Sequence, residues 1–334
     1  MPFIGTHSGK FHCDEVFACW MLKTLPEYSE HVVLRSRDPD VLKTCDIVVD
    51  VGAVYDNSQL KYDHHQRSFN ETMKTLGLLE FDTKLSSAGL IYAHYGKRVI
   101  GILRNIPNGD PHLDILYKKM YENFVECCDA VDNGIPQFDG IPRYRLASTL
   151  TSRVNDLNPS WNEPEDSVNL DERFTQAMKL VGEEFTGKLK YYHESWLSVR
   201  DLVKKAIDKR YEVDPSGKII LFENGGVPWE EDFLDIEKEE GLEKFDISYA
   251  LLADNSGPWY VQSIPLNELQ TFENRAPLPE PWRGHRDADL EAICGIPGSI
   301  FVHASGFLGG TKTREGTLKM AIEALKILGK YKTI

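Results

Sequence analysis

The sequence contains no long run of apolar residues, and its longest runs are far too short to span a bilayer. Its N-terminus, MPFIGTHSGK, has neither the apolar core of a secretory signal nor an amphipathic leader rich in Arg and Ser. We therefore expect a soluble, intracellular protein without a membrane partner, and no targeting leader is visible in this chain.

Cysteine is scarce, with six residues scattered along the chain and none in a CxxC pair. This pattern excludes zinc-knuckle spacing and does not indicate a disulfide framework. Isolated cysteines in a chain of this length are typical of small buried side chains in a reducing compartment.

Basic residues are also outnumbered, with 38 Lys and Arg against 52 Asp and Glu, so the formal net charge is −14. Such a charge repels nucleic acid at long range and argues against binding through a broad basic surface. It does not exclude a nuclease, because bound metal ions and a local basic cleft can hold phosphate inside an acidic protein. The basic residues between Lys312 and Lys332 form one local patch, although charge alone favours a solvated helix face.

The length of 334 residues indicates two domains rather than one. In the first half, short apolar runs at 3–7, 32–36 and 46–52 alternate with amphipathic stretches such as 13–25 and 113–134. This alternation predicts an α/β domain with a parallel sheet covered by helices.

A long helical stretch then extends from about 171 to 210. In the second half, β-type runs follow one another with turn signals such as DPSG and DNSGP, which favour antiparallel pairing. We therefore predict an α/β protein with a parallel-sheet domain at 1–165, a helical linker at 166–211 and a smaller, mixed-sheet α+β domain at 212–334.

Histidines and aspartates cluster at the ends of the elements predicted in the first half. The clusters are His7, His12, Asp14 and Glu15; Asp50; Asp63, His64 and His65; and Asp129 with Asp132. Ligands of open α/β sheets bind beyond the carboxyl ends of the strands, where His7 and Asp50 are expected. Clusters at successive junctions are difficult to explain by structural roles alone, and they predict a metal site.

The residue types indicate the chemistry of that site. Two divalent cations, about 3.5–4 Å apart, can hold a bridging hydroxide and bind a phosphoryl oxygen. Mixed imidazole and carboxylate ligands suit manganese, iron or zinc better than calcium. The adjacent Asp-His-His triplet supplies a ligand, a residue that orients it and a positive group for a substrate.

Together with these clusters, YDHHQ resembles the DHH phosphoesterase superfamily, which includes RecJ-type nucleases and manganese pyrophosphatases. A closer resemblance is to the melanocyte-proliferating-gene (Myg) exonuclease family. It covers the chain from end to end and is carried by THSGKFHCDE, DIVVDVG, YDHHQRSF, TKLSSAGLIY, YENFVECCDAVDNGI, LNPSW, PLPEPWRG and GIPGSIFVHASGFLGGTKTREG. The resemblance implies a DHH-like catalytic domain and a metal-dependent nuclease that degrades single-stranded RNA from the 3′ end. It also implies a location in the nucleus and mitochondrion, with the cytoplasm as an alternative.

The resemblance also implies roles for individual residues. The implied metal ligands are His7, His12, Asp14, Asp50, His64 and Asp129, with Asp50 bridging two Mn²⁺ or Mg²⁺ ions. The implied catalytic residues are His7, Asp14, Asp50, His64 and His65, with His65 close to the substrate phosphate. Asp63 is expected to orient a neighbouring ligand. Asp132 is expected to support the ligands as well, because it shares a helix face with Asp129 and only one of the two need bind metal.

One position departs from the superfamily pattern. The superfamily usually reads His-x-x-x-Asp-x-Asp, whereas this chain has His12 where a carboxylate is expected before Asp14. A neutral imidazole lowers the negative charge around the metals, so the role of His12 stays open.

The second half resembles the substrate-binding domain of the superfamily. HASGFLGGTKT reads as a strand, a glycine-rich turn and a helix start, where backbone N–H groups can hold a phosphate. The expected substrate-binding residues are His65, Arg283, His303, Gly309, Gly310, Thr311 and Lys312.

The function that we predict is a metal-dependent 3′–5′ exoribonuclease with a two-metal mechanism. Two alternatives remain: a hydrolase of pyrophosphate or a cyclic dinucleotide, and a non-catalytic regulatory module that keeps the metal site. The sequence leaves open RNA against DNA, the metal that is loaded and the oligomeric state, a homodimer included.

Overall fold

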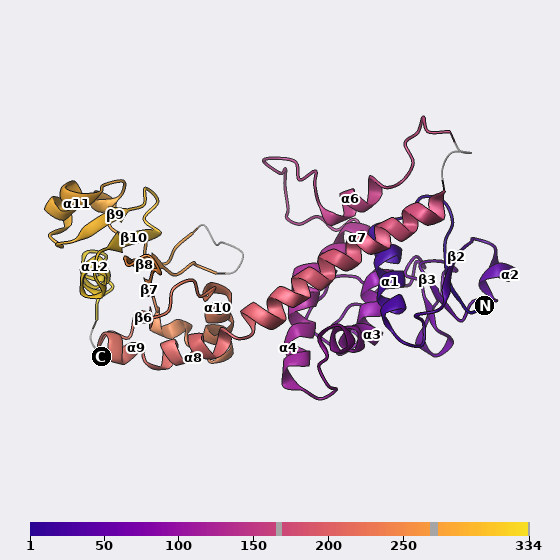
Figure 1. Ribbon diagram of the computed structural model, residues 1–334, viewed down its shortest axis with the longest axis horizontal. Coiled ribbons are helices and arrows are strands. Elements are labelled where there is room, and N and C mark those ends of the chain that lie inside the picture. Colours follow the sequence, from indigo (N-terminus) through magenta and orange to yellow (C-terminus); the bar gives the residue numbers. More distant parts are fainter. Residues whose placement is uncertain (165–168, 268–272, 333–334) are drawn as a thin grey trace. The chain divides into compact units, whose positions relative to one another are not determined.

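The computed structural model describes residues 1–164, 169–267 and 273–332 (Figure 1). The chain forms two compact units, Met1–Glu194 and Ser195–Ile334. The predicted linker, 166–211, therefore includes residues of both units. None of the helices in the described ranges combines the length and the apolar character that a bilayer span requires.

The first unit is built on a five-stranded sheet. Its strands are β1 (Phe3–Thr6), β2 (Val32–Arg35), β3 (Ile47–Val49), β4 (Tyr55–Asp56) and β5 (Lys61–Tyr62). Their order is β2-β1-β3-β5-β4, and all neighbours pair in parallel except β4, which is antiparallel at the edge. The apolar runs of the sequence form the first three strands, of which β1 and β3 are largely buried, whereas β2 lies at the edge of the sheet and is partly exposed.

Helices surround this sheet and one another. They are α1 (Cys13–Thr24), α2 (Pro39–Leu42), α3 (Ser87–Arg104), α4 (Pro111–Met120), α5 (Glu126–Asp132), α6 (Leu150–Asn155) and α7 (Leu170–Tyr191). Helix α1 packs against both α3 and α7, and the ring of Phe17 lies 5.3 Å from that of Phe185 in α7. A Cβ atom at Gly182 would clash with the indole of Trp20, so glycine allows α7 to approach α1 closely.

The second unit contains another five-stranded sheet. Its strands are β6 (Ile219–Phe222), β7 (Tyr249–Ala253), β8 (Trp259–Ser263), β9 (Ser299–Val302) and β10 (Leu308–Thr311), in the order β6-β7-β8-β10-β9. Pairing is antiparallel except between β6 and β7, which are parallel. The antiparallel prediction was wrong for this pair, because an unpredicted helix, α10 (Glu230–Glu239), carries the chain back between them.

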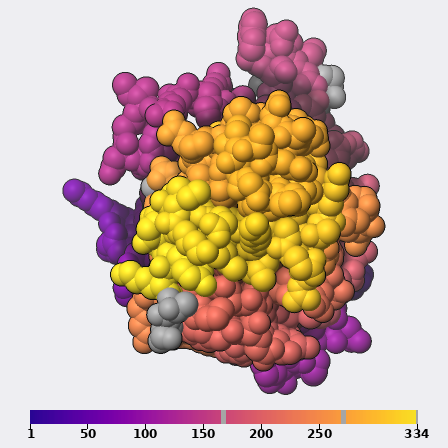
Figure 2. All heavy atoms as spheres, turned by 90° about the vertical axis from the view of Figure 1, so that its left-hand side faces the viewer, coloured from indigo at the N-terminus to yellow at the C-terminus, as the bar shows by residue number. Residues whose placement is uncertain are grey.

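The remaining helices of this unit are α8 (Arg200–Asp208), α9 (Arg210–Val213), α11 (Asp287–Cys294) and α12 (Arg314–Ile327). Shorter helical turns in the two units are Asn57–Gln59, Tyr121–Val125, Tyr192–Trp196, Glu243–Phe245 and Glu280–Trp282. Figure 2 shows a face of the second unit on which the yellow C-terminal residues lie between the orange residues that precede them and the salmon-coloured α8 and α9. The α/β class is thus confirmed, with a largely parallel first sheet and a mixed second sheet.

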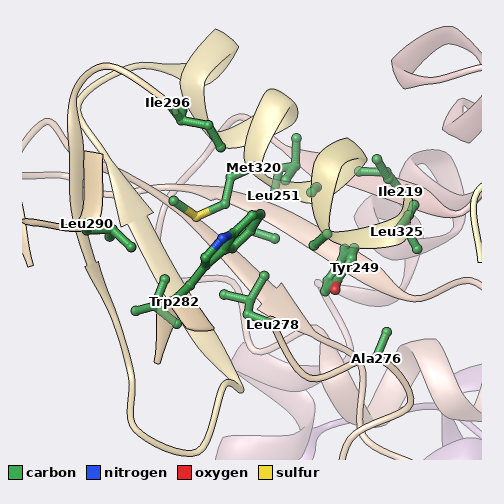
Figure 3. Close-up of a cluster of buried hydrophobic side chains, with 14 residues drawn as sticks. Ile219, Tyr249, Leu251, Ala276, Leu278, Trp282, Leu290, Ile296, Met320 and Leu325 are labelled. Atoms are coloured by element: carbon green, nitrogen blue, oxygen red, sulfur yellow. The ribbon is translucent and has the colours of Figure 1, made fainter. Parts of the chain in front are cut away.

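Apolar clusters hold the second sheet to its helices. On one face, Met320 of α12 lies beside Leu251 of β7 and the ring of Trp282, and Leu325 of α12 lies near Ile219 of β6 (Figure 3). A separate cluster joins β6 and β7 to α8 and α10, and it includes Val203 and Phe233. Buried apolar side chains on both faces of this sheet make the second unit a folded body with its own core.

Candidate metal centre

Three neighbouring strands of the first sheet end in polar residues. His7 follows β1, Asp50 follows β3, and Asp63 and His64 follow β5. Because β1, β3 and β5 are parallel neighbours, their carboxyl ends lie at one edge of the sheet. The structure brings the side chains of His7, Asp50 and His64 together at this edge.

Asp50 is shared between two groups of side chains. One carboxylate oxygen, Oδ2, lies 3.4 Å from Nε2 of His7, and the other, Oδ1, lies 3.3 Å from Nε2 of His64. Its backbone adopts a left-handed conformation, with φ of 59°, which Asp tolerates better than most residues. The N–H of Asp50 still donates to the carbonyl oxygen of Tyr62, so the carboxylate leaves the sheet from a fixed position.

The first group contains His7, His12, Glu15 and Asp50, whose ligand atoms lie within 4.8 Å of one another. Nε2 of His7 is 2.9 Å from Oε1 of Glu15, and both side chains are buried, whereas His12 is exposed. Glu15 also accepts a hydrogen bond from the backbone N–H of His12 at the start of α1. Glu15 had no predicted role beyond its place in a cluster, although a Glu three residues after a helix cap is a recognised signal.

The second group contains Asp14, His64 and Asp132 and adjoins the same Asp50 carboxylate. Nε2 of His64 lies 3.0 Å from Oδ2 of Asp132 and 3.8 Å from Oδ2 of Asp14. The hydroxyl of Ser87, at the start of α3, donates to Asp14 and orients its carboxylate. Residues from α1, α5 and the end of β5 therefore converge on one point.

Asp129, the predicted ligand, does not join either group. Its carboxylate accepts hydrogen bonds from the N–H and hydroxyl of Ser86, the N–H of Gly89 and the hydroxyl of Tyr121, and it is fully buried. A Cβ atom at Gly89 would lie 2.3 Å from this carboxylate, so glycine makes the contact possible. Asp129 thus joins α5 to α3, whereas Asp132 reaches His64, so this geometry favours Asp132 over the predicted Asp129 as a ligand.

His65 lies beside the centre with its side chain 61% exposed. Its Nδ1 lies 2.7 Å from Oδ1 of Asp63 and 3.6 Å from Oδ1 of Asp50. Asp63 also accepts the backbone N–H groups of Ala53 and His65, which fixes its carboxylate. Asp63 therefore orients the imidazole of His65.

Close pairing of acids and imidazoles shifts the pKa values in the centre. Burial opposes the charged form of His7, but hydrogen bonds to Asp50 and Glu15 outweigh it and raise the pKa of His7 to about 10. The pKa of His64 is raised to about 10 in the same way, because Asp132 and Asp50 outweigh burial. Burial favours the neutral form of Asp50, yet the two imidazoles hold its pKa well below the usual range.

The donor set fits divalent cations. Among the described residues, Asp14 Oδ1, Asp50 Oδ1 and His64 Nε2 are buried without a well-aligned hydrogen bond, although His64 Nε2 lies within ion-pair distance of Asp50 and Asp132. Carboxylate and imidazole atoms left in this way at a converging cluster suit a hard or borderline metal ion. His7, Glu15, Asp50 and His12 would hold one ion, and Asp50, Asp14, His64 and Asp132 would hold another.

A cavity of about 750 Å³ opens over the second group. His64, His65 and Asp132 line it on the side of the metal centre. Another part of its lining comes from α6, with Ser152 and Asn155. Among the described lining residues, Lys84 carries the only amine, and its ammonium group also lies 5.6 Å from the ring centre of Phe69.

Asn158 holds the loop between β1 and α1 in place. Its buried side-chain amide accepts the N–H of Phe11 and donates to the carbonyl oxygen of the same residue, at 3.0 and 2.8 Å. Phe11 directly precedes His12 in the chain. Asn158 was not identified as a site residue from the sequence, because its partner lies 147 positions away and is backbone.

The predicted phosphate cradle of the second unit has a different structure. Gly309, Gly310 and Thr311 lie in β10, so the prediction of a glycine-rich turn was wrong at these positions. A Cβ atom at Gly310 would come within 2.9 Å of Phe301, so this glycine serves close packing. Buried Thr311 directs its hydroxyl to the carbonyl oxygen of Thr313.

The other predicted substrate-binding residues of this unit lie around the same hairpin. His303 is exposed in the turn between β9 and β10, with Nδ1 2.9 Å from the hydroxyl of Ser305. Lys312 is exposed after β10, and Arg283 donates from Nε to the carbonyl oxygen of Leu278. The basic groups of His303 and Lys312 therefore remain accessible to an anion, while Arg283 is partly engaged by the backbone.

Comparisons with known proteins cover nearly the whole chain. The MYG1_exonuc family model, described as "Uncharacterised protein family (UPF0160)", matches residues 3–325. A MYG1 protein of Caenorhabditis elegans is 54% identical over 325 residues, which cover 97% of this chain and 95% of the relative. The MYG1 exonucleases of Bos taurus and Homo sapiens are 53% and 51% identical over 323 residues, covering 96% of this chain and 84% and 85% of the relatives. The resemblance noted in the sequence is confirmed, and the chain belongs to the MYG1 exonuclease family.

Proposed function

We propose that this protein is a metal-dependent phosphodiesterase that degrades single-stranded RNA from its 3′ end and releases 5′-nucleotides. The single observation that carries this proposal is the Asp50 carboxylate, whose two oxygens face two separate groups of imidazole and carboxylate side chains. A shared carboxylate between two such groups is the arrangement that a two-metal phosphoryl-transfer site requires.

The family resemblance implies Mn²⁺ or Mg²⁺ in both groups, and the imidazole ligands favour Mn²⁺ of the two. When bound, such a pair supplies a nucleophile at neutral pH and stabilises charge on the phosphoryl group. In this proposal Asp132 is a ligand in place of the predicted Asp129, and Glu15 adds a carboxylate next to His7. That carboxylate offsets the charge lost where His12 replaces an acid, so the centre retains its attraction for cations.

The residues around the cavity suit a phosphodiester substrate. The hydrogen bond to Asp63 raises the pKa of His65, which favours an imidazolium at the mouth of the centre. Because Asp63 holds Nδ1, the other ring nitrogen of His65 is left to donate a proton to a substrate oxygen. Lys84 adds a second positive charge in the lining and would bind the phosphate next to the one that is cleaved.

The nucleic-acid substrate is supported by the relatives, since those of Bos taurus and Homo sapiens are named exonucleases. The choice of RNA and of the 3′ end rests on the family resemblance. In this proposal, the second unit binds the RNA through the accessible side chains of His303 and Lys312.

The experiment that tests this proposal follows nucleotide release from single-stranded RNA labelled at either the 3′ or the 5′ end. Each substrate is incubated with Mn²⁺, with Mg²⁺ and with a chelator, and a DNA of the same sequence serves as the matched substrate. We expect early loss of the 3′ label, formation of 5′-nucleotides and no cleavage with the chelator. Equal rates on DNA would broaden the substrate class without changing the chemistry.

Two results would overturn parts of the proposal. Hydrolysis of pyrophosphate or a cyclic dinucleotide, with no cleavage of RNA or DNA, would make the protein a small-phosphate hydrolase. Metal binding without hydrolysis of any phosphate ester would make it a non-catalytic metal-binding module.

A further inference from the structure

The segment between α5 and α6 exposes an unusual set of side chains. Five large apolar residues between positions 135 and 146 are exposed, and they are Ile135, Phe138, Ile141, Tyr144 and Leu146. Ile141 is 93% exposed and Tyr144 is 74% exposed. Single exposed apolar residues are ordinary, but a contiguous set of this size marks an interaction surface.

Two arginines flank Tyr144 in this segment, in the sequence Arg143-Tyr144-Arg145. Both are exposed, and within the part of the chain that the structure describes neither forms an ion pair. A hollow of about 740 Å³ is lined by these three residues together with Phe138 and Ile141. Its size suits a flat ring system of a small ligand or nucleobase.

The segment is continuous with the cavity of the metal centre at both ends. It begins after Asp132 and Asn133 of the α5 end, and it ends at Thr149 before α6, and all three residues line that cavity. Figure 1 shows the segment as a loop that extends from the first unit beside α6. The two ends of this loop therefore lie at the cavity that would hold the end of a polymer.

We infer that residues 135–146, named here the RYR loop, bind the single-stranded nucleic acid next to the nucleotide that is being cleaved. This inference rests on the proposed function and adds to it the element that contacts the strand outside the metal centre. Exposed arginines that form no ion pair with the described residues, in a chain whose net charge is −14, are complementary to a polyanion. Aromatic rings beside arginine are the features on which unpaired bases stack, with little dependence on base sequence.

The test measures binding and cleavage separately. Two double variants are compared with the wild type, Phe138→Ala with Tyr144→Ala and Arg143→Gln with Arg145→Gln. A matched control, Lys179→Gln with Lys190→Gln, removes the same charge from exposed positions of α7. Binding of a fluorescein-labelled single-stranded oligoribonucleotide is followed by anisotropy in the presence of chelator, where no cleavage can occur.

We expect both RYR-loop variants to bind the oligonucleotide about tenfold more weakly than the wild type, which is the usual effect of losing a base-stacking or phosphate contact. The control pair is expected to bind like the wild type. With metal present, the ratio of kcat/KM on the oligonucleotide to kcat/KM on bis(p-nitrophenyl) phosphate should also fall about tenfold, because only the longer substrate reaches the loop. Tyr144→Trp, which keeps a stacking ring, should bind like the wild type.

Equal oligonucleotide binding by wild type and RYR-loop variants would overturn the inference, as would a wild type that does not bind the oligonucleotide. A wild-type dimer that Ile141→Ala with Tyr144→Ala converts to a monomer, measured by light scattering, would instead assign the loop to contacts between copies of the chain. The binding assay contains no metal, so it stays informative even if the protein hydrolyses no phosphodiester. Failure of the loop inference and failure of the proposed function are therefore distinguishable.

Discussion

The two units of this protein both contain a five-stranded sheet, but polar residues leave the two sheets in different ways. In the first unit, His7, Asp50 and His64 follow the ends of adjacent parallel strands and meet at one edge. In the second unit, the glycines of β10 lie inside the sheet and pack against neighbouring side chains. In a parallel sheet, the residues that follow neighbouring strands lie together at one edge. In an antiparallel hairpin, neighbouring strands end at opposite edges, so only the turn between them places such residues together.

A similar contrast occurs within α5, where Asp129 and Asp132 are three residues apart. The first carboxylate is surrounded by hydrogen-bond donors from α3 and the preceding turn, and the second faces His64. Both residues lie on the same face of α5, so their positions in the sequence do not distinguish them. Only the side chains around each carboxylate separate the structural role of Asp129 from the role of Asp132 beside His64.

Replacing Asp129 and Asp132 separately should give the largest effects on stability and activity and should test the difference between their roles. Asp129→Ala leaves the donors of Ser86, Gly89 and Tyr121 buried without an acceptor, so the free energy of unfolding should fall by about 3 kcal/mol or more. Asp132→Ala should lower that free energy less, because the Asp132 side chain is partly exposed, and should weaken metal-dependent hydrolysis by roughly 10–100-fold. Urea unfolding and initial rates at several Mn²⁺ concentrations measure the two effects, and the reverse pattern would restore Asp129 as the ligand.

An intermediate effect is expected from Gly310→Ala in the second sheet. The added methyl group would press on the rings of Phe301 and Tyr260, so we expect a loss of about 1–2 kcal/mol in the free energy of unfolding. Ser305→Ala, in the exposed turn of the same hairpin, serves as a control for the region. If Gly310→Ala weakened RNA binding without affecting stability, the glycine would belong to a phosphate cradle after all.

The smallest expected effect is on the pH dependence of stability, which should differ between His94 and the histidines of the metal centre. Burial lowers the pKa of His94, whose Nε2 lies 2.8 Å from the hydroxyl of Tyr55, so its folded pKa is below the unfolded value of 6.5. Its contribution to stability is therefore fully present above pH 6.5 and is lost as the pH falls through the folded pKa. In the metal-free protein, His7 and His64 act in the opposite window, because their raised pKa values make their contribution present below pH 6.5 and lost as the pH rises toward 10. A bound metal ion would hold both imidazoles in the neutral form.

His94→Gln keeps a polar partner for Tyr55 but cannot gain a proton. Relative to the wild type, this variant should lose less stability between pH 7 and the acid range, and urea unfolding at a series of pH values measures the difference. Parallel stability curves for the two proteins below pH 6.5 would show that His94 does not carry this dependence.

Much of the first sheet could be predicted from the sequence, because buried strands such as DIVVD are short apolar runs whose ends are marked by polar residues. Helix α10 was missed between β6 and β7, and with it the parallel pairing of those strands. The glycines at 309 and 310 are compatible with a turn and with a closely packed strand, and only the neighbouring rings decide between the two.

The candidate site was predictable to a similar extent. Strand ends indicated His7 and Asp50, and the Asp-His-His triplet indicated His64, but the role of Glu15 was hidden by its position as a helix-capping residue. Asn158 acts through the backbone of Phe11, which no side-chain pattern encodes. The roles of Glu15 and Asn158 therefore depend on contacts with other segments of the chain, and local patterns did not reveal them.

The most direct test of the account replaces Asp50 with asparagine. Asn tolerates the left-handed backbone at this position, so the fold should remain intact, while one of the two carboxylate oxygens becomes an amide. Metal content per chain and RNA hydrolysis are measured together, with Asp40→Asn at an exposed position as the matched control. We expect the Asp50 variant to bind less Mn²⁺ and to lose more than about a hundredfold in hydrolysis. Wild-type metal content and turnover in that variant would contradict a centre built on the shared carboxylate.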